Sequence, residues 1–202
     1  MRLQPSPEGD PERLRDLAWM QGIQNGDQEA FRELILEYQS RVAGVIARMA
    51  GSSSDAEELT HEVFERVWRS AHRYQPSAKL STWLLTIARN LVLNEIRYRQ
   101  RHPTISRDIV REDGQYPEDS TPDTASVPPD AALLESELQQ AIDDALQQLP
   151  ENQRTALVLQ RFEALSYEEI ATLLDVSVPA VKSLLFRART TLRELLKDYL
   201  NE

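Results

Sequence analysis

LSYEEIATLLDVSVPAVKSLLFRARTTLRELL, residues 165–196, is the stretch that decides the fold of the C-terminal part of the chain. It opens on a capping box, SYEE, in which Ser166 caps the first amides of a helix and Glu169 reaches back to the cap. DVSV then interrupts the apolar spacing, and Ser177 caps a second helix that tolerates Pro179 in its first turn. We therefore predict two helices joined by a tight turn.

The second of these helices has two contrasting faces. Its apolar residues recur at steps of three and four, which predicts a buried stripe of Val181, Leu184 or Leu185, Ala188, Leu192 and Leu195. The opposite face carries Lys182, Ser183, Phe186, Arg187 and Thr190. This is the helix-turn-helix arrangement, whose second helix enters the major groove of DNA. The alternative is an ordinary amphipathic helix with a solvated face, which charge patterning alone favours, whereas the outward ring of Phe186 weighs against it.

Composition favours an all-α protein. The 202-residue chain has 41% hydrophobic residues, only 6 Gly, and many Leu, Ala, Glu, Gln and Arg, which lose little side-chain freedom in a helix. The absence of Cys excludes disulfides and cysteine-ligated zinc. No stretch approaches the roughly 18 uncharged apolar residues of a membrane span, and the N-terminus lacks the apolar core of a signal peptide. We expect a cytoplasmic protein without membrane insertion.

The formal net charge of -10 is unevenly distributed. Eight cations and one acid lie between Arg66 and Arg101, whereas nine acids and one cation lie between Asp108 and Glu137. The acidic segment contains GQYPEDSTPDTASVPPD, which cannot bury enough apolar area to offset its ordering entropy. We therefore predict two small helical domains joined by an acidic flexible linker. The predicted divisions are an N-terminal extension at 1–25, domains at 26–101 and 132–202, and the linker at 102–131.

The first domain is predicted to contain three or four helices. The last of them begins near Ser81 and buries Leu84, Ile87, Ala88, Leu91 and Ile96, with Trp83 also in the core. Its other face carries Arg89, Asn90, Asn94, Arg97 and Arg101, next to a loop with Tyr74 and Lys79. Cations beside aromatic and amide groups suit single-stranded nucleic acid, because phosphates need cations and unstacked bases need flat or amide partners.

These motifs together resemble the extracytoplasmic-function (ECF) sigma factors, the small promoter-recognition subunits of bacterial RNA polymerase. The resemblance covers nearly the whole chain. GDQEAFRELILEYQSRV is similar to their region 2.1, and DAEELTHEVFERVWRSAHRY to region 2.2. STWLLTIARNLVLNEIRYRQR is similar to regions 2.3 and 2.4, and the stretch from LPENQRTALV to VKSLLFRAR to region 4.

The resemblance implies a role for each group of residues. Binding to the clamp helices of core polymerase would use Glu58, Glu62, Phe64 and Trp68. Recognition and melting of the minus-ten element would use Tyr74, Lys79, Asn90, Asn94 and Arg97. Recognition of the minus-thirty-five element would use Lys182, Ser183, Phe186 and Arg187, while the same domain contacts the polymerase flap. An anti-sigma factor that holds both domains is the further partner implied.

The sequence departs from the family pattern at two places. His61 stands where many members have Gln, and PAVKSLL replaces GTVKSRL, so that Pro179, Ala180 and Leu184 replace groups often able to contact DNA. These departures leave the promoter sequence open.

Other classes of function fit less well. A stand-alone two-domain helix-turn-helix regulator would explain the C-terminal motif but not STWLLTIARN. An enzyme is not expected, because HEVF lacks the second His of a zinc-protease motif and no phosphate loop or catalytic triad is present. We therefore predict no catalytic residue, no metal site and no cofactor. A helical interaction scaffold is the third alternative.

Overall fold

The computed structural model describes residues 10–51, 53–76, 79–102 and 129–200. All regular elements within these ranges are helical, which confirms the all-α class. The N-terminal part contains α1 (Pro11–Gln24), α2 (Gln28–Ala50), α3 (Ser53–Ser70), the short 3-10 helix η1 (Ala71–Arg73) and α4 (Leu80–Arg101). The C-terminal part contains α5 (Pro129–Gln147), α6 (Glu151–Arg161), α7 (Tyr167–Leu174), α8 (Val178–Leu195) and α9 (Lys197–Leu200). Most of the predicted acidic linker lies outside the described residues.

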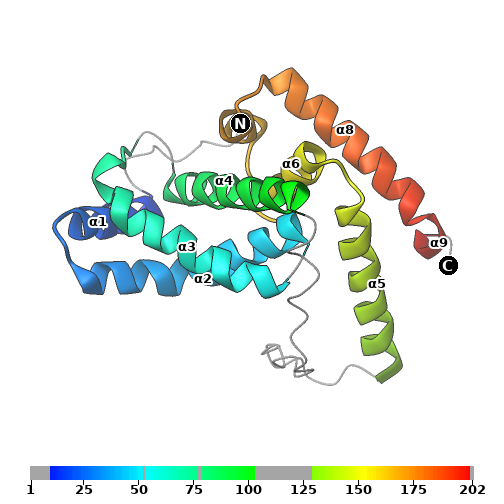
Figure 1. Ribbon diagram of the computed structural model, residues 1–202, viewed down its shortest axis with the longest axis horizontal. Helices are drawn as coiled ribbons and strands as arrows, with labels where there is room; N and C mark the ends of the chain where they lie inside the picture. The colour runs from blue at the N-terminus through cyan, green and yellow to red at the C-terminus, as the bar shows by residue number, and fades with distance from the viewer. Residues whose placement is uncertain (1–9, 52, 77–78, 103–128, 201–202) are drawn as a thin grey trace.

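Helix α2 forms the centre of the N-terminal domain. It is capped by Asp27, whose side chain accepts hydrogen bonds from two backbone amides, and it ends at Gly51 in the left-handed conformation (φ 78°) that favours glycine. One face is buried along its whole length: Leu34, Tyr38, Val42, Val45, Ile46 and Met49. Helices α1, α3 and α4 pack around it, as Figure 1 shows.

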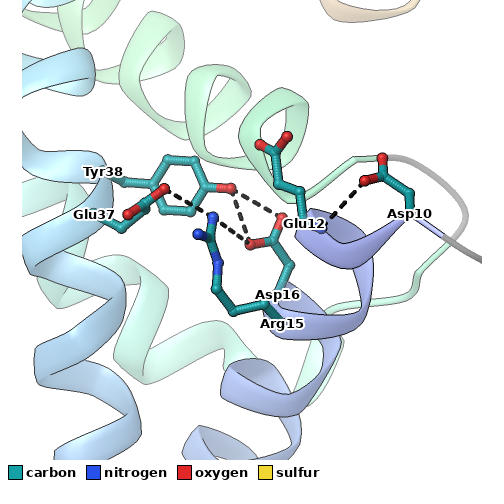
Figure 2. A network of polar contacts seen from close by, with 6 residues as sticks. All are labelled: Asp10, Glu12, Arg15, Asp16, Glu37 and Tyr38. Carbon is teal, nitrogen blue, oxygen red and sulfur yellow. Dashed lines mark hydrogen bonds and ion pairs between the residues drawn. The ribbon is translucent and has the colours of Figure 1, made fainter.

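Helix α1 lies within the predicted N-terminal extension and was not predicted as a helix. Asp10 caps it and Pro11 starts it, as expected for a first turn. Buried Asp16 accepts hydrogen bonds from the Tyr38 hydroxyl at 3.0 and 2.9 Å, and Arg15 pairs with Glu37 at 2.8 Å (Figure 2). These contacts fix α1 to α2.

The C-terminal domain packs α8 against α6 and α7. Val181, Leu185 and Ala188 form the buried part of α8, so Leu185 rather than Leu184 occupies the core. The predicted burial of Leu195 is wrong, since its side chain is 38% exposed. The apolar stripe of α8 is deeply buried only in its first three turns, and Leu195 lies in the last one.

The two domains contact each other directly. Arg41 of α2 pairs with Glu163, a carboxylate that is almost completely buried after α6. The Arg48 guanidinium lies 4.2 Å from the centre of the Phe162 ring, and Gln147 of α5 donates a hydrogen bond to the Arg48 carbonyl at 3.1 Å. A single apolar cluster continues from α2 into α6. The chain therefore folds as two domains with a shared, partly polar interface.

The central position of α2 predicts a strong response to truncation of its buried face. Ile46 is completely buried, so Ile46→Ala should lower the free energy of unfolding by about 2–5 kcal/mol. Leu36 on the same helix is 55% exposed, and Leu36→Ala should change stability by no more than about 0.5 kcal/mol. Urea unfolding of the two variants measures both values. Equal effects would contradict the assignment of α2 as the central helix.

Candidate nucleic-acid interface

The turn between α7 and α8 has the geometry expected from its sequence. Ser166 accepts a hydrogen bond from the Glu169 amide at 3.1 Å, and Glu169 accepts one from the Ser166 amide at 2.8 Å, which confirms the capping box. Asp175 ends α7 in the left-handed conformation (φ 55°), which Asp tolerates better than most residues. Ser177 then caps α8 through the Ala180 amide. The two helices are thus held at a tight turn.

The first turns of α8 present the predicted duplex-reading residues to solvent. Lys182, Ser183 and Arg187 are exposed, and Phe186 is 72% exposed, the largest value among the exposed large hydrophobic residues. A shallow pocket beside them is lined by Tyr167, Lys182, Leu185, Phe186, Arg189, Thr190 and Arg193. Arg189 donates to Gln160 of α6 at 3.1 Å, which orients the cation at the edge of this face. The arrangement offers cations, a hydroxyl and an aromatic edge to one ligand surface.

Helix α4 has the two faces that the sequence predicts. Leu84, Ala88 and Leu91 are buried, whereas Asn90, Asn94 and Arg97 are exposed. Arg89 is half-buried, and burial lowers the pKa of its guanidinium. Its side chain donates to the Leu173 carbonyl at the end of α7, at 3.4 Å. Arg89 therefore contacts the C-terminal domain, while its three neighbours face solvent.

Asn90 lies in a cationic pocket that sequence reasoning did not assemble. The pocket is formed by the end of α3, η1 and α4, and its lining is Arg66, Arg69, Ser70, His72, Arg73, Ile87 and Asn90. Arg66 and Arg69 are held in place by Glu62 and Glu65 one turn earlier, at 2.6 and 2.5 Å. The excess of cations between residues 66 and 101 was the sequence signal for this pocket. An amide surrounded by cations suits a base with its phosphates.

The loop before α4 differs from the expectation for Tyr74. Its ring is only 9% exposed and packs on Trp83 of α4 with ring centres 5.2 Å apart. Tyr74 is therefore not an open stacking platform in this conformation, because Trp83 and the core cover it. Lys79 is exposed and lies 3.5 Å from the Glu169 carboxylate of α7. Trp83 is half-buried against the core, as predicted.

The predicted polymerase-binding residues of α3 separate into two groups. Glu58 and Trp68 are exposed, and Glu62 is half-exposed beside Arg66. Phe64 is 5% exposed and lies in the core of its own domain. This position disagrees with the expectation that Phe64 contacts a partner. Trp68 is 36% exposed and packs on Phe31 of α2, with ring centres 4.9 Å apart. A surface of Glu58, Glu62 and Trp68 remains on α3.

Within the described ranges no group of three or more His, Cys, Asp or Glu side chains is arranged to hold a metal ion. None of the described helices is both long enough and apolar enough to cross a membrane.

Comparisons with known proteins identify both halves of the chain. The family model described as Sigma-70 region 2 matches residues 34–102, and the one described as Sigma-70, region 4 matches residues 139–192. The RNA polymerase sigma-H factor of Pseudomonas aeruginosa is 35% identical over 93% of this chain and 97% of its own length. The ECF RNA polymerase sigma-E factor of Escherichia coli K12 is 33% identical over 88% of this chain and 92% of its own length.

Solved structures show the same relationship. The sigma factor RpoE in complex with the anti-sigma factor NepR, from Bartonella quintana, is 25% identical with a TM-score of 0.63, covering 83% of this chain and 96% of that one. CnrH in complex with the cytosolic domain of CnrY has a TM-score of 0.64 and covers 94% of this chain and 99% of that one. At 24% identity, CnrH is similar in fold.

The capping box at the helix-turn-helix predicts a dependence of stability on pH. Partial burial raises the pKa of Glu169, but its hydrogen bonds with Ser166 and the charge of Lys79 outweigh burial and hold the pKa below its ordinary value of 4.5. A lowered pKa in the folded state stabilises the fold above the unfolded-state value, and this contribution is lost as pH falls through the folded-state value. Glu169→Gln should therefore be less stable than the wild type at neutral pH, with a difference that shrinks below pH 4.5.

Unfolding curves at a series of pH values measure this difference. Ser177→Ala is the control, because it removes the cap of α8 without removing a titratable group, so its loss of stability should not vary with pH. A constant difference between wild type and Glu169→Gln across the series would contradict the role assigned to the Glu169 charge.

Proposed function

Because this chain belongs to the ECF family of sigma factors, we propose that its two domains divide promoter recognition between them. The chain is a transcription initiation factor, an alternative sigma subunit of RNA polymerase, and not an enzyme. In our proposal residues 26–101 bind core polymerase and recognise the minus-ten element, and residues 132–202 recognise the minus-thirty-five element.

The first turns of α8 are the proposed reader of the minus-thirty-five duplex. Lys182 and Arg187 can donate to guanine, Ser183 can serve several bases, and the exposed edge of Phe186 can contact a thymine methyl group. Because Phe186 is 72% exposed, its ring contributes little to packing within the chain, which supports an external partner. These four residues lie near the N-terminal end of α8, after the tight turn that follows α7, and helix-turn-helix proteins enter the major groove with this end of their second helix.

The cationic pocket around Asn90 is the proposed site of the minus-ten element. Asn90 and Asn94 can bond the edges of unstacked bases, while Arg97, Lys79 and the arginines of the pocket neutralise phosphates. In the free chain Lys79 pairs with Glu169 of the C-terminal domain. When DNA binds, a phosphate would take the place of this carboxylate as the partner of Lys79. In this proposal Tyr74 does not contact DNA but supports, from the core, the segment that precedes Lys79.

Protein partners form the remaining part of the proposal. Core polymerase binds through its clamp helices to the Glu58, Glu62 and Trp68 surface of α3 and through its flap to the C-terminal domain. An anti-sigma factor holds both domains in the inactive state, by analogy with the RpoE–NepR complex. A protein with these partners and with promoter DNA as its target would act in the cytoplasm.

The observation that carries the proposal is the presence, on one chain, of an exposed cationic face on the second helix of a helix-turn-helix and a separate amide-containing cationic pocket. The decisive experiment combines the purified chain with core polymerase from its host and a panel of host promoter fragments. We expect binding to core and initiation at a subset of the fragments. Tight binding to duplex DNA without binding to core would overturn the proposal in favour of a stand-alone regulator.

Substitutions on α8 should weaken recognition of the upstream element. Lys182→Ala and Arg187→Ala are each expected to cost about 1–3 kcal/mol of binding free energy if the lost contact is to a base edge. Competition between upstream-element duplexes, measured with the holoenzyme, gives these values. Arg32→Ala, which removes a cation paired with Glu29 on α2, serves as the control and should bind like the wild type. Wild-type affinity in both α8 variants would move the reading surface elsewhere.

Asn90→Ala should have a different effect. The asparagine is exposed in the pocket and contributes little to the core, so we expect loss of promoter opening with retention of upstream-element binding. Permanganate reactivity of unpaired thymines reports opening, and duplex competition reports upstream binding. Parallel loss of both activities would indicate misfolding instead of a lost base contact.

A further inference from the structure

Residues 71–76, which precede Lys79 and α4, are held by side chains of α1, a helix far away in the sequence. Arg13 of α1 donates a hydrogen bond from Nη2 to the Pro76 carbonyl at 3.0 Å, and Gln24 donates from Nε2 to the Ala71 carbonyl at 3.0 Å. The two donors lie at opposite ends of α1 and their acceptors at opposite ends of residues 71–76. We call residues 71–76 the loop base.

Helix α1 is itself firmly attached to α2, so its side chains can hold the loop base in a fixed position. Asp16 is 5% exposed, and both of its carboxylate oxygens accept from the Tyr38 hydroxyl, as Figure 2 shows. Arg15 adds the exposed pair with Glu37. Removal of Tyr38 would leave a buried carboxylate without this partner, which is costly. The contacts therefore hold α1 at one place on α2.

The loop base is held from its other side by α4. Tyr74, which lies within it, packs on Trp83 and is almost completely buried. Backbone hydrogen bonding adds the Tyr74 amide, which donates to the Ala71 carbonyl at 3.0 Å, so the Ala71 oxygen accepts from both Gln24 and Tyr74. The loop base is thus clamped between α1 and α4, three residues before Lys79.

We propose that Arg13 and Gln24 of α1 are positioning residues for minus-ten recognition: they fix the loop base so that the Asn90 pocket discriminates between bases. This inference rests on the proposed function of that pocket. A site that reads bases must be held within a fraction of an ångström by a supporting shell. Neither side chain touches DNA in this proposal, because both are committed to backbone carbonyls.

Arg13 and Gln24 are expected to affect base discrimination at the minus-ten element and not the stability of the fold. Arg13 is half-buried and Gln24 exposed, so their loss should leave the folded state and core binding intact. What changes is the freedom of the loop base, and with it the preference of the holoenzyme for one base over another. The expected signature is a flattened base preference at the minus-ten element with an unchanged preference at the minus-thirty-five element.

The experiment uses the full chain in holoenzyme with core polymerase and a linear promoter library randomised at six minus-ten positions, with transcripts counted by sequencing. In the double variant Arg13→Ala/Gln24→Ala we expect the ratio between preferred and disfavoured bases to fall about three- to tenfold, about the net effect of one ordinary hydrogen bond, because only part of the two lost bonds is felt at the bases. Arg13→Lys in place of Arg13→Ala keeps a cationic donor at this position, so the variant Arg13→Lys/Gln24→Ala should regain part of the base preference.

Matched controls are Gln21→Ala, an exposed glutamine on the same helix, and Arg32→Ala on α2, both of which should keep the wild-type preference. A uniform loss of transcription across the library, or a loss of core binding or thermal stability in the double variant, would overturn the proposal because α1 would then only support the fold. An unchanged preference would also overturn it. If the wild-type holoenzyme itself showed no minus-ten preference, the proposed function of the pocket would fail instead.

Discussion

The buried apolar face of α2 is the contact on which the rest of the structure depends. Helices α1, α3 and α4 pack along it, and its second half also contacts α5 and α6 of the other domain. The same helix supplies Tyr38 to fix α1, and Arg41 and Arg48 to the domain interface. Because one helix makes all these contacts, the positions of both proposed DNA-binding surfaces depend on how the other helices pack against α2.

Both proposed reading helices use the same physical device. In α4 and in α8 one face is buried and supplies the packing energy, which leaves the other face free to carry groups that would be costly in a core. Burying cations requires partners, so most arginines and lysines of these two helices remain at the surface, where phosphates can reach them. The net charge of -10 therefore coexists with two cationic surfaces, since many of the acids lie between residues 108 and 137.

Local patterns predicted the helix-turn-helix well because its determinants are local. The capping box at Ser166, the cap at Ser177 and the apolar spacing of α8 all act within a few residues, and each is present in the fold. Phe64 and Tyr74 were assigned to partner contacts by resemblance, but their burial depends on which helices pack against them. The same limit applied to α1, whose mixed sequence gave no clear stripe and which is held by the Asp16–Tyr38 contact and by the buried side chains of Met20 and Ile23. The domain interface joins residues more than a hundred positions apart, such as Arg41 and Glu163, and no local pattern indicates such a pairing.

The central claim is that two separate surfaces read two separate promoter elements. Site-specific photocrosslinking tests it most directly, with a photoreactive phenylalanine derivative placed at Phe186 in one variant and at Asn94 in another, each in holoenzyme on an open promoter. The account predicts that position 186 crosslinks to duplex DNA at the minus-thirty-five element and that position 94 crosslinks to the unpaired strand at the minus-ten element. Crosslinking of both positions to the same element, or the reverse assignment, would contradict it.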